Sequence, residues 1–165
     1  ADIDGLRIRV MENPVYVDTF RELGANAVPM AWTEALTAMQ QGTIDGQENP
    51  INVIHSFKLY ETQDHMTLSR HTYAPAIFVM GMPVWKQLPE AAQTVLEQAA
   101  QEAAEHERRM NAEMQAEQLA ELREAGMQIV EEPDIAAFQE AVAPVYEKYG
   151  EQFGDTLPRI QKALE

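Results

Sequence analysis

The chain of 165 residues contains no cysteine, which excludes disulfide bridges, thiolate nucleophiles and cysteine-based zinc sites. It also lacks a run of the ~20 apolar residues that a membrane-spanning helix needs, and it does not start with a basic segment followed by an apolar run. We therefore expect no membrane insertion. Its 8 glycines and 9 prolines are scattered singly, which excludes collagen-like and low-complexity classes.

Basic residues are also scarce. Lys and Arg total 12 against 27 Asp and Glu, which gives a formal net charge of −15. No window is basic enough to neutralise a phosphate backbone, so nucleic acid is not an expected partner. The field of such a chain repels anions, and an anionic ligand would depend on a few local arginines. The hydrophobic fraction of 45% is enough for one packed domain.

The familiar catalytic motifs are missing. Ser56 and Ser69, the only serines, lie outside any Gly-x-Ser-x-Gly elbow, and the isolated glycines form no phosphate-binding loop. His106-Glu107 begins like a zinc-protease helix, but Met110 stands where the second imidazole is needed. We therefore expect no enzymatic activity, no cofactor and no metal site, although a hydrolase that uses dispersed carboxylates stays a third possibility.

Strand-like and helical patterns alternate along the chain, which predicts an α/β fold with a mostly parallel sheet and helices on its faces. Helix-start signals support this, with Asn13 before Pro14 and Thr33 as a second expected N-cap. The predicted strands are residues 6–10, 27–30, a short piece from 44, 66–68, 74–80 and 127–130; the predicted helices are 14–23, 33–40, 51–57, 83–88, 89–125, 134–146 (bent at Pro144) and one after 155–156.

Two of these segments are unusual. The apolar run Ala74–Met80 shows no polar alternation, which predicts a strand buried on both faces. From Pro89 to Ala125 good helix formers continue without an internal proline or glycine. At ~1.5 Å per residue that helix would be roughly 55 Å long, against the ~30 Å diameter of a small domain. We expect that it is not buried along its whole length.

Candidate binding residues follow the first three strands. Ligands of open parallel sheets bind beyond the carboxyl ends of strands, where Arg9, Trp32 and Gln47-Glu48-Asn49 fall. A guanidinium fork, a flat indole and an amide together suit a small organic acid. Each residue also has an ordinary structural interpretation: a surface ion pair for Arg9, a core position for Trp32 and a turn for Asn49.

The order of several short stretches resembles a known family. These stretches are Leu6–Val10, Gly24–Asn26, Pro29–Trp32 and Asp45–Pro50. In combination they resemble the solute-binding proteins of tripartite ATP-independent periplasmic (TRAP) transporters, of the DctP type, and the DGQENP stretch is the most specific. The later apolar segment, the Pro83–Trp85 turn and the long helix are similar too, so the resemblance covers essentially the whole chain.

The resemblance implies a periplasmic-binding-protein-like fold, in which two α/β lobes close on a ligand and a long helix runs across both. It implies that Arg9 forms a salt bridge with the ligand carboxylate, that Trp32 (commonly Phe in the family) lines the pocket, and that Asn49 hydrogen-bonds the acid. Glu12 and Asn13 would lie in the loop that faces the ligand. The expected function is to capture a carboxylate-bearing solute, a C4-dicarboxylate or a sugar acid, in the periplasm for delivery to membrane permease subunits.

The chain corresponds to the family pattern only from the second lobe onward. The resemblance implies a second ligand-binding lobe in residues 1–72, a crossover strand and inter-lobe helix in 73–126, and completing elements in 127–165. Without the first lobe, Ala74–Met80 and part of the helix would expose apolar surface. We then expect self-association, segment exchange or pairing with a separate N-terminal chain.

The alternative function is a structural or partner-interaction protein built around the helix of residues 89–125. The partner-binding surface of that helix would be the apolar stripe formed by Val95, Ala99, Ala103, Met110 and Met114. This alternative is weakened because the stripe is rich in alanine and no strict heptad continues along it.

Overall fold

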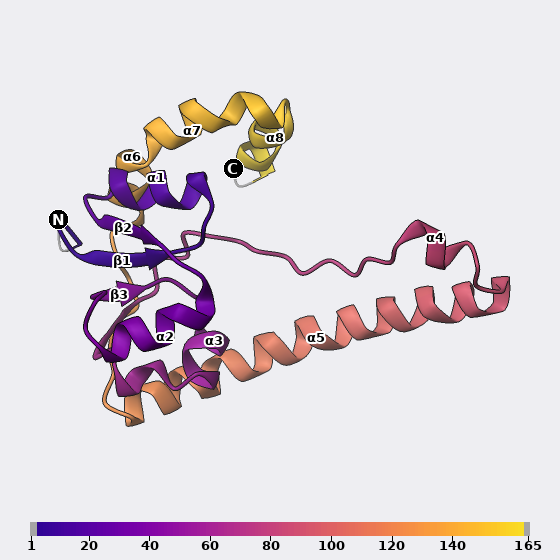
Figure 1. Ribbon diagram of the computed structural model, residues 1–165, viewed down its shortest axis with the longest axis horizontal. Coiled ribbons are helices and arrows are strands. Elements are labelled where there is room, and N and C mark those ends of the chain that lie inside the picture. The colour runs from indigo at the N-terminus through magenta and orange to yellow at the C-terminus, as the bar shows by residue number, and fades with distance from the viewer. Residues whose placement is uncertain (1–2, 164–165) are drawn as a thin grey trace.

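The computed structural model describes residues 3–163, and its body is built on short parallel strands (Figure 1). The central sheet has the order β2-β1-β3, and a separate pair joins β4 to β5. Every pairing is parallel, which confirms the predicted α/β class. The strands are β1 (Arg7–Val10), β2 (Asn26–Pro29), β3 (Gly46–Gln47), β4 (His65–Thr67) and β5 (Gln128–Val130).

Helices α1 (Pro14–Glu22) and α2 (Trp32–Gln40) cover opposite faces of the central sheet (Figure 1). The predicted start of α1 is confirmed, because the Asn13 side chain accepts a hydrogen bond from the Val15 N–H at 2.9 Å. The expected cap at Thr33 is wrong. Helix α2 has Ala31 as its N-cap and no side-chain cap bond, so Thr33 already lies in its first turn.

The C-terminal helices pack back on α1. The predicted bent helix after Asp134 is confirmed as two helices, with Pro144 in the first turn of the second. Asp18 on α1 accepts hydrogen bonds from Lys148 at 2.6 Å and from Tyr149 at 2.7 Å. The remaining elements are α3 (Ile51–Ser56), η1 (Leu59–Glu61), α4 (Met82–Trp85), α6 (Ile135–Ala141), α7 (Ala143–Tyr149), η2 (Gly150–Phe153) and α8 (Thr156–Ala163).

Two hydrophobic clusters hold the body together. Ile8 and Val10 of β1 pack with Phe20 of α1 in one cluster. The other cluster joins α2 and α3 to β4 and to the C-terminal end of the long helix, and it includes Leu122, which is 0% exposed. The first cluster covers the face of the sheet that α1 packs on, and the second covers the face that α2 packs on. Both faces of the sheet are therefore buried, as is usual for parallel strands between helices.

The long helix α5 (Glu90–Glu124) has 35 residues, which corresponds to about 52 Å. Only its C-terminal part lies against the body, where Gln118 and Leu122 are its buried residues. Residues 74–110, which we call the arm and which include α4, project away from the body (Figure 1). The predicted incomplete burial of this helix is therefore confirmed.

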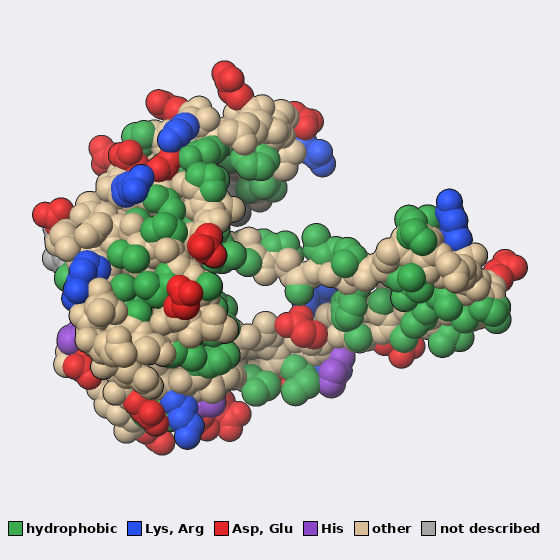
Figure 2. Space-filling view, in the orientation of Figure 1, with side chains coloured by type: hydrophobic (Ala, Val, Ile, Leu, Met, Phe, Trp, Pro, Cys, Tyr) green, Lys and Arg blue, Asp and Glu red, His purple; other side chains and the backbone are tan. Residues whose placement is uncertain are grey.

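The predicted buried strand at Ala74–Met80 is wrong. The segment runs along the arm, and within residues 3–163 it pairs with no other strand. Ile77, Phe78 and Val79 are 77%, 71% and 86% exposed. Figure 2 shows hydrophobic side chains gathered along the arm. No part of the described chain covers the segment, so the expected exposure of apolar surface is confirmed.

We expect Leu122→Ala to lower the free energy of unfolding by about 3 kcal/mol, because the substitution leaves a cavity where α5 meets the body. Urea denaturation followed by circular dichroism measures this. Leu6→Ala, at a side chain that is 40% exposed, is the matched control and should cost less than about 1 kcal/mol. Equal losses for the two variants would show that α5 does not anchor the core.

Candidate functional site

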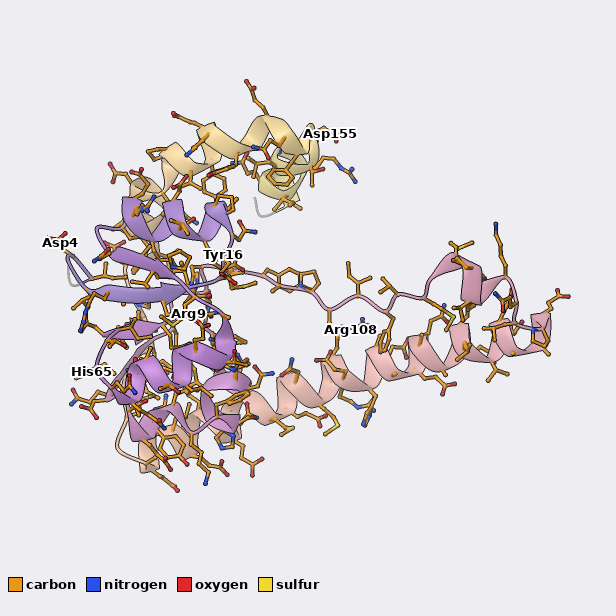
Figure 3. The ribbon with its side chains drawn as sticks, in the orientation of Figure 1. Asp4, Arg9, Tyr16, His65, Arg108 and Asp155 are labelled. Atoms are coloured by element: carbon orange, nitrogen blue, oxygen red, sulfur yellow. The ribbon has the colours of Figure 1, made fainter. Side chains whose placement is uncertain are left out.

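Arg9 occupies the carboxyl end of β1 and is 5% exposed. Its neighbours Ile8 and Val10 point into the α1 cluster, so the alternation of the strand turns Arg9 toward α2 (Figure 3). There its Nε donates a hydrogen bond to the carbonyl of Met30 at 2.9 Å. Its guanidinium carbon lies 5.4 Å from the ring centroid of Trp32, a cation–π contact.

The two arginines of β1 differ in their charge partners. Arg7 donates two hydrogen bonds to the Asp45 carboxylate, Nη2 at 2.6 Å and Nε at 2.9 Å. Within residues 3–163, no carboxylate lies within 4.0 Å of the Arg9 side chain. The exposed arginine is thus neutralised by its own chain, whereas the buried one has no carboxylate beside it.

Burial lowers the pKa of Arg9, and the negative charges of Glu48 and Glu12 oppose this shift. Arginine still remains charged, because its ordinary pKa is far above neutral pH. Nε–H is the only donor of this side chain that has a hydrogen-bond partner in the described residues. Since no fully buried side-chain nitrogen or oxygen there lacks a partner, the Nη groups are not completely enclosed. They form a free fork of donors, suited to a carboxylate.

Trp32 and Asn49 lie on the same side of the sheet as Arg9. Trp32 begins α2, is half-buried and packs edge-on against Phe57, with ring centroids 5.2 Å apart. Asn49 donates a hydrogen bond to the Gln47 side chain at 2.5 Å. Gln47 is the register partner of Arg9 in the β1–β3 pairing. The structure therefore places Trp32 against Arg9, and it places Asn49 against Gln47, the neighbour of Arg9 in the sheet.

Glu12 and Asn13 are exposed and lie in the loop that leaves β1. The side-chain oxygen of Asn13 caps α1, and its NH₂ group is available to donate hydrogen bonds to other partners. Glu12 contributes its charge to the field at Arg9. These two residues are near the end of the strand, but no hydrogen bond in the described residues joins either of them to Arg9, Trp32 or Asn49.

Two features of the site were missed by sequence reasoning. The Met30 carbonyl fixes the Arg9 side chain, and no residue type signals a role for a backbone group. Glu48 pairs with His71, Oε2 to Nε2 at 3.2 Å, across 23 positions of sequence. No sequence pattern signals this contact, because the two residues are distant in the chain and meet only through the fold.

Other site types find little support in the described residues. Residues 3–163 contain no group of three or more His, Asp and Glu side chains placed to hold a metal ion. Of the helices in this range, none combines the length and hydropathy needed to cross a membrane. One cavity of about 400 Å³ lies between α1, the C-terminal helices and the segment of residues 69–73, and another of about 240 Å³ lies between α3 and α5. Neither is lined by Arg9, Trp32 or Asn49.

The chain is similar to known proteins along nearly its whole length. A profile of the protein family described as "Bacterial extracellular solute-binding protein, family 7" (DctP) matches residues 1–152. A solute-binding protein of Verminephrobacter eiseniae is 42% identical over 164 residues, which are 99% of this chain and 49% of that protein.

Solved structures agree with this match. A TRAP periplasmic solute-binding protein of Polaromonas sp. JS666, bound to D-erythronate, has a TM-score of 0.87 and 42% identity over 93% of this chain and 50% of that one. Another from Pseudomonas putida F1, with bound D-glucuronate, has a TM-score of 0.90 and 32% identity over 97% of this chain and 52% of that one. The chain therefore spans about half the length of the relatives that it matches.

We expect the Asp45–Arg7 pair to stabilise the fold only above acidic pH. Hydrogen bonds from Arg7 lower the pKa of Asp45 to about 2, against ~3.9 in an unfolded chain. The stabilisation is therefore complete above pH ~4 and is lost as the pH falls toward 2. Asp45→Asn should flatten the pH dependence of the unfolding free energy in this window. Asp155→Asn is the control, and an equal effect of both variants would contradict the assignment.

Proposed function

The chain belongs to family 7 of the bacterial extracellular solute-binding proteins, and on that premise we propose that it captures a carboxylate-bearing small molecule at the edge formed by Arg9, Trp32 and Asn49. The observation that carries the proposal is the buried guanidinium of Arg9, which lacks a carboxylate partner within residues 3–163. A ligand anion would supply the missing charge.

Each of the three residues has a distinct part in this proposal. The free Nη groups of Arg9 form a bidentate pair with the ligand carboxylate, while Nε stays bound to the Met30 carbonyl. Trp32 provides a flat apolar wall beside that pair. Asn49 has committed one amide N–H to Gln47, and its carbonyl oxygen is left to accept a hydrogen bond from a ligand hydroxyl. Glu12 and Asn13 would line the rim.

The chemical class of the ligand is an organic acid, a C4-dicarboxylate or a sugar acid. The structures of two relatives support this class. They hold D-erythronate and D-glucuronate, each of which has one carboxylate and several hydroxyls. The family and its structural neighbours are binding proteins rather than enzymes. The proposed mechanism is accordingly reversible capture, with no covalent step.

The proposed setting is the periplasm, with delivery of the solute to the membrane permease subunits of a TRAP transporter. The family description and the relatives named as TRAP periplasmic proteins support this setting. Because the chain spans about half of those relatives, it supplies one wall of the pocket, and binding by this chain alone should be weak. A helical partner-interaction protein is not favoured, because the family match includes the strands and the site as well as α5.

We expect Arg9→Lys to weaken D-glucuronate binding by about tenfold or more, because lysine keeps the charge but loses the planar fork. Arg7→Lys is the matched control, because Arg7 lies in the same strand and is already paired with Asp45. This variant should bind D-glucuronate as tightly as the unsubstituted chain. Chemical-shift titration at millimolar ligand measures all three. The proposal fails if the unsubstituted chain does not bind, or if both lysine variants bind equally well.

We infer that the arm packs against further polypeptide. One candidate is a separate N-terminal chain that corresponds to the half of the relatives that this chain does not span. The other is a second copy of this chain, by self-association or segment exchange. The exposed Ile77, Phe78 and Val79 support this inference. Light scattering of the isolated chain should show a dimer or larger species, and Phe78→Asp should shift it toward monomer. A monomer that binds no apolar dye would contradict the inference.

A further inference from the structure

The cavity of about 240 Å³ between α3 and α5 lies where the long helix leaves the body and the arm begins (Figure 1). Four of the seven residues that line it carry a carboxamide side chain, and the other three are a proline, an isoleucine and an alanine. No lining residue is therefore charged. We call this cavity the amide pocket. Its four carboxamides belong to Asn52 of α3 and to Asn111, Gln115 and Gln118 of α5.

Gln118 is the most buried of the four, with an exposed fraction of 7%. Within residues 3–163 its side chain makes no hydrogen bond. A carboxamide that is removed from water without a partner costs free energy. No completely enclosed side-chain nitrogen or oxygen in this range lacks a partner, so the Gln118 amide is open to the pocket that it lines. It offers an unused donor and an unused acceptor there.

The other three carboxamides add to this set. The side-chain oxygen of Asn52 accepts a hydrogen bond from the Val53 N–H at 3.0 Å, and the NH₂ group of Asn111 donates one to Glu107 at 3.1 Å. In the described part of the chain, the NH₂ group of Asn52, the side-chain oxygen of Asn111 and the Gln115 amide have no hydrogen-bond partner. Both helices therefore bring unused polar groups to the pocket.

These groups suit hydroxyls better than ions. A hydroxyl both donates and accepts, so it can pair with either end of a carboxamide. A carboxylate would find no cation among the lining residues, and the net charge of −15 repels it. The volume of about 240 Å³ is well above the ~30 Å³ that one water occupies in the liquid. The pocket therefore has room for a ligand of several heavy atoms, whose hydroxyls would replace the hydrogen bonds of water.

We propose that the amide pocket binds a small neutral polyol, at a site separate from the edge formed by Arg9, Trp32 and Asn49. A polyol that bonds Asn52 and the α5 amides joins the two helices, and by mass action it stabilises the attachment of α5 to the body. This inference does not rest on the capture of an acid at Arg9, because the pocket shares no lining residue with that edge.

The test compares two uncharged ligands on the full chain. Erythritol is the probe, and butane-1,4-diol, with the same carbon chain and fewer hydroxyls, is the matched control ligand. Titration of the side-chain NH₂ chemical shifts measures both affinities. Gln118→Leu removes the buried amide and keeps a side chain of similar size, and Gln115→Leu does the same at an exposed lining position. Gln101→Leu, at an exposed position of α5 that does not line the pocket, is the control variant.

We expect erythritol to shift the NH₂ resonances of Asn52 and Gln118 and to bind about fivefold or more tightly than butane-1,4-diol, the size of one neutral hydrogen bond. Gln118→Leu and Gln115→Leu should each weaken erythritol binding by about fivefold, and Gln101→Leu should match the parent. Should Gln118→Leu fail to fold by circular dichroism, Gln115→Leu decides in its place.

The inference is overturned if erythritol shifts neither NH₂ resonance, which would leave the pocket to water, or if a folded Gln118→Leu binds erythritol as tightly as the parent. Loss of erythritol binding in Arg9→Lys would also overturn it, because the pocket would then belong to the acid site. A parent chain that binds erythritol but not D-glucuronate would support the inference while the proposed function fails.

Discussion

A buried positive charge without a carboxylate partner in the described chain is the constraint on which this structure depends. Removing a guanidinium from water is costly unless hydrogen bonds or charges compensate. Here the Met30 carbonyl, the face of Trp32 and the more distant charges of Glu48 and Glu12 supply part of that compensation. The net charge of −15 repels anions at long range, so the proposed capture of an anion would depend on this one local group.

The fold places that group by simple strand geometry. Alternation along β1 sends Ile8 and Val10 into one core and Arg9 to the opposite side, and parallel pairing brings Gln47 beside Arg9. Charge pairing then separates the two arginines, since Asp45 neutralises Arg7 at the other end of the strand. The same short sheet thus pairs one arginine within the chain and leaves the other without a carboxylate, available for the proposed ligand.

Much of this could be predicted from the sequence, because it depends on local pattern. Strand alternation and helix signals placed Arg9, Trp32 and Asn49 at the ends of parallel strands. In the structure Trp32 contacts Arg9, and Asn49 contacts Gln47, the register partner of Arg9. The sequence could not show whether the apolar run Ala74–Met80 would be covered, because burial depends on what packs against it. It could not show the pairing of His71 with Glu48 either, since that contact depends on the turn after β4. Ligand binding by the site residues and the three-part division of the chain stay predictions.

The most direct test of the account is nuclear magnetic resonance of the Arg9 Nε–H group during titration with D-glucuronate and, separately, with D-glucose. The two sugars share a ring and most hydroxyls, but only the first has a carboxylate. The account predicts that D-glucuronate shifts the Arg9 resonance, that D-glucose does not, and that the Arg7 resonance is unaffected by either. An Arg9 resonance that stays unchanged while D-glucuronate binds elsewhere on the chain, or that responds equally to both sugars, would contradict it.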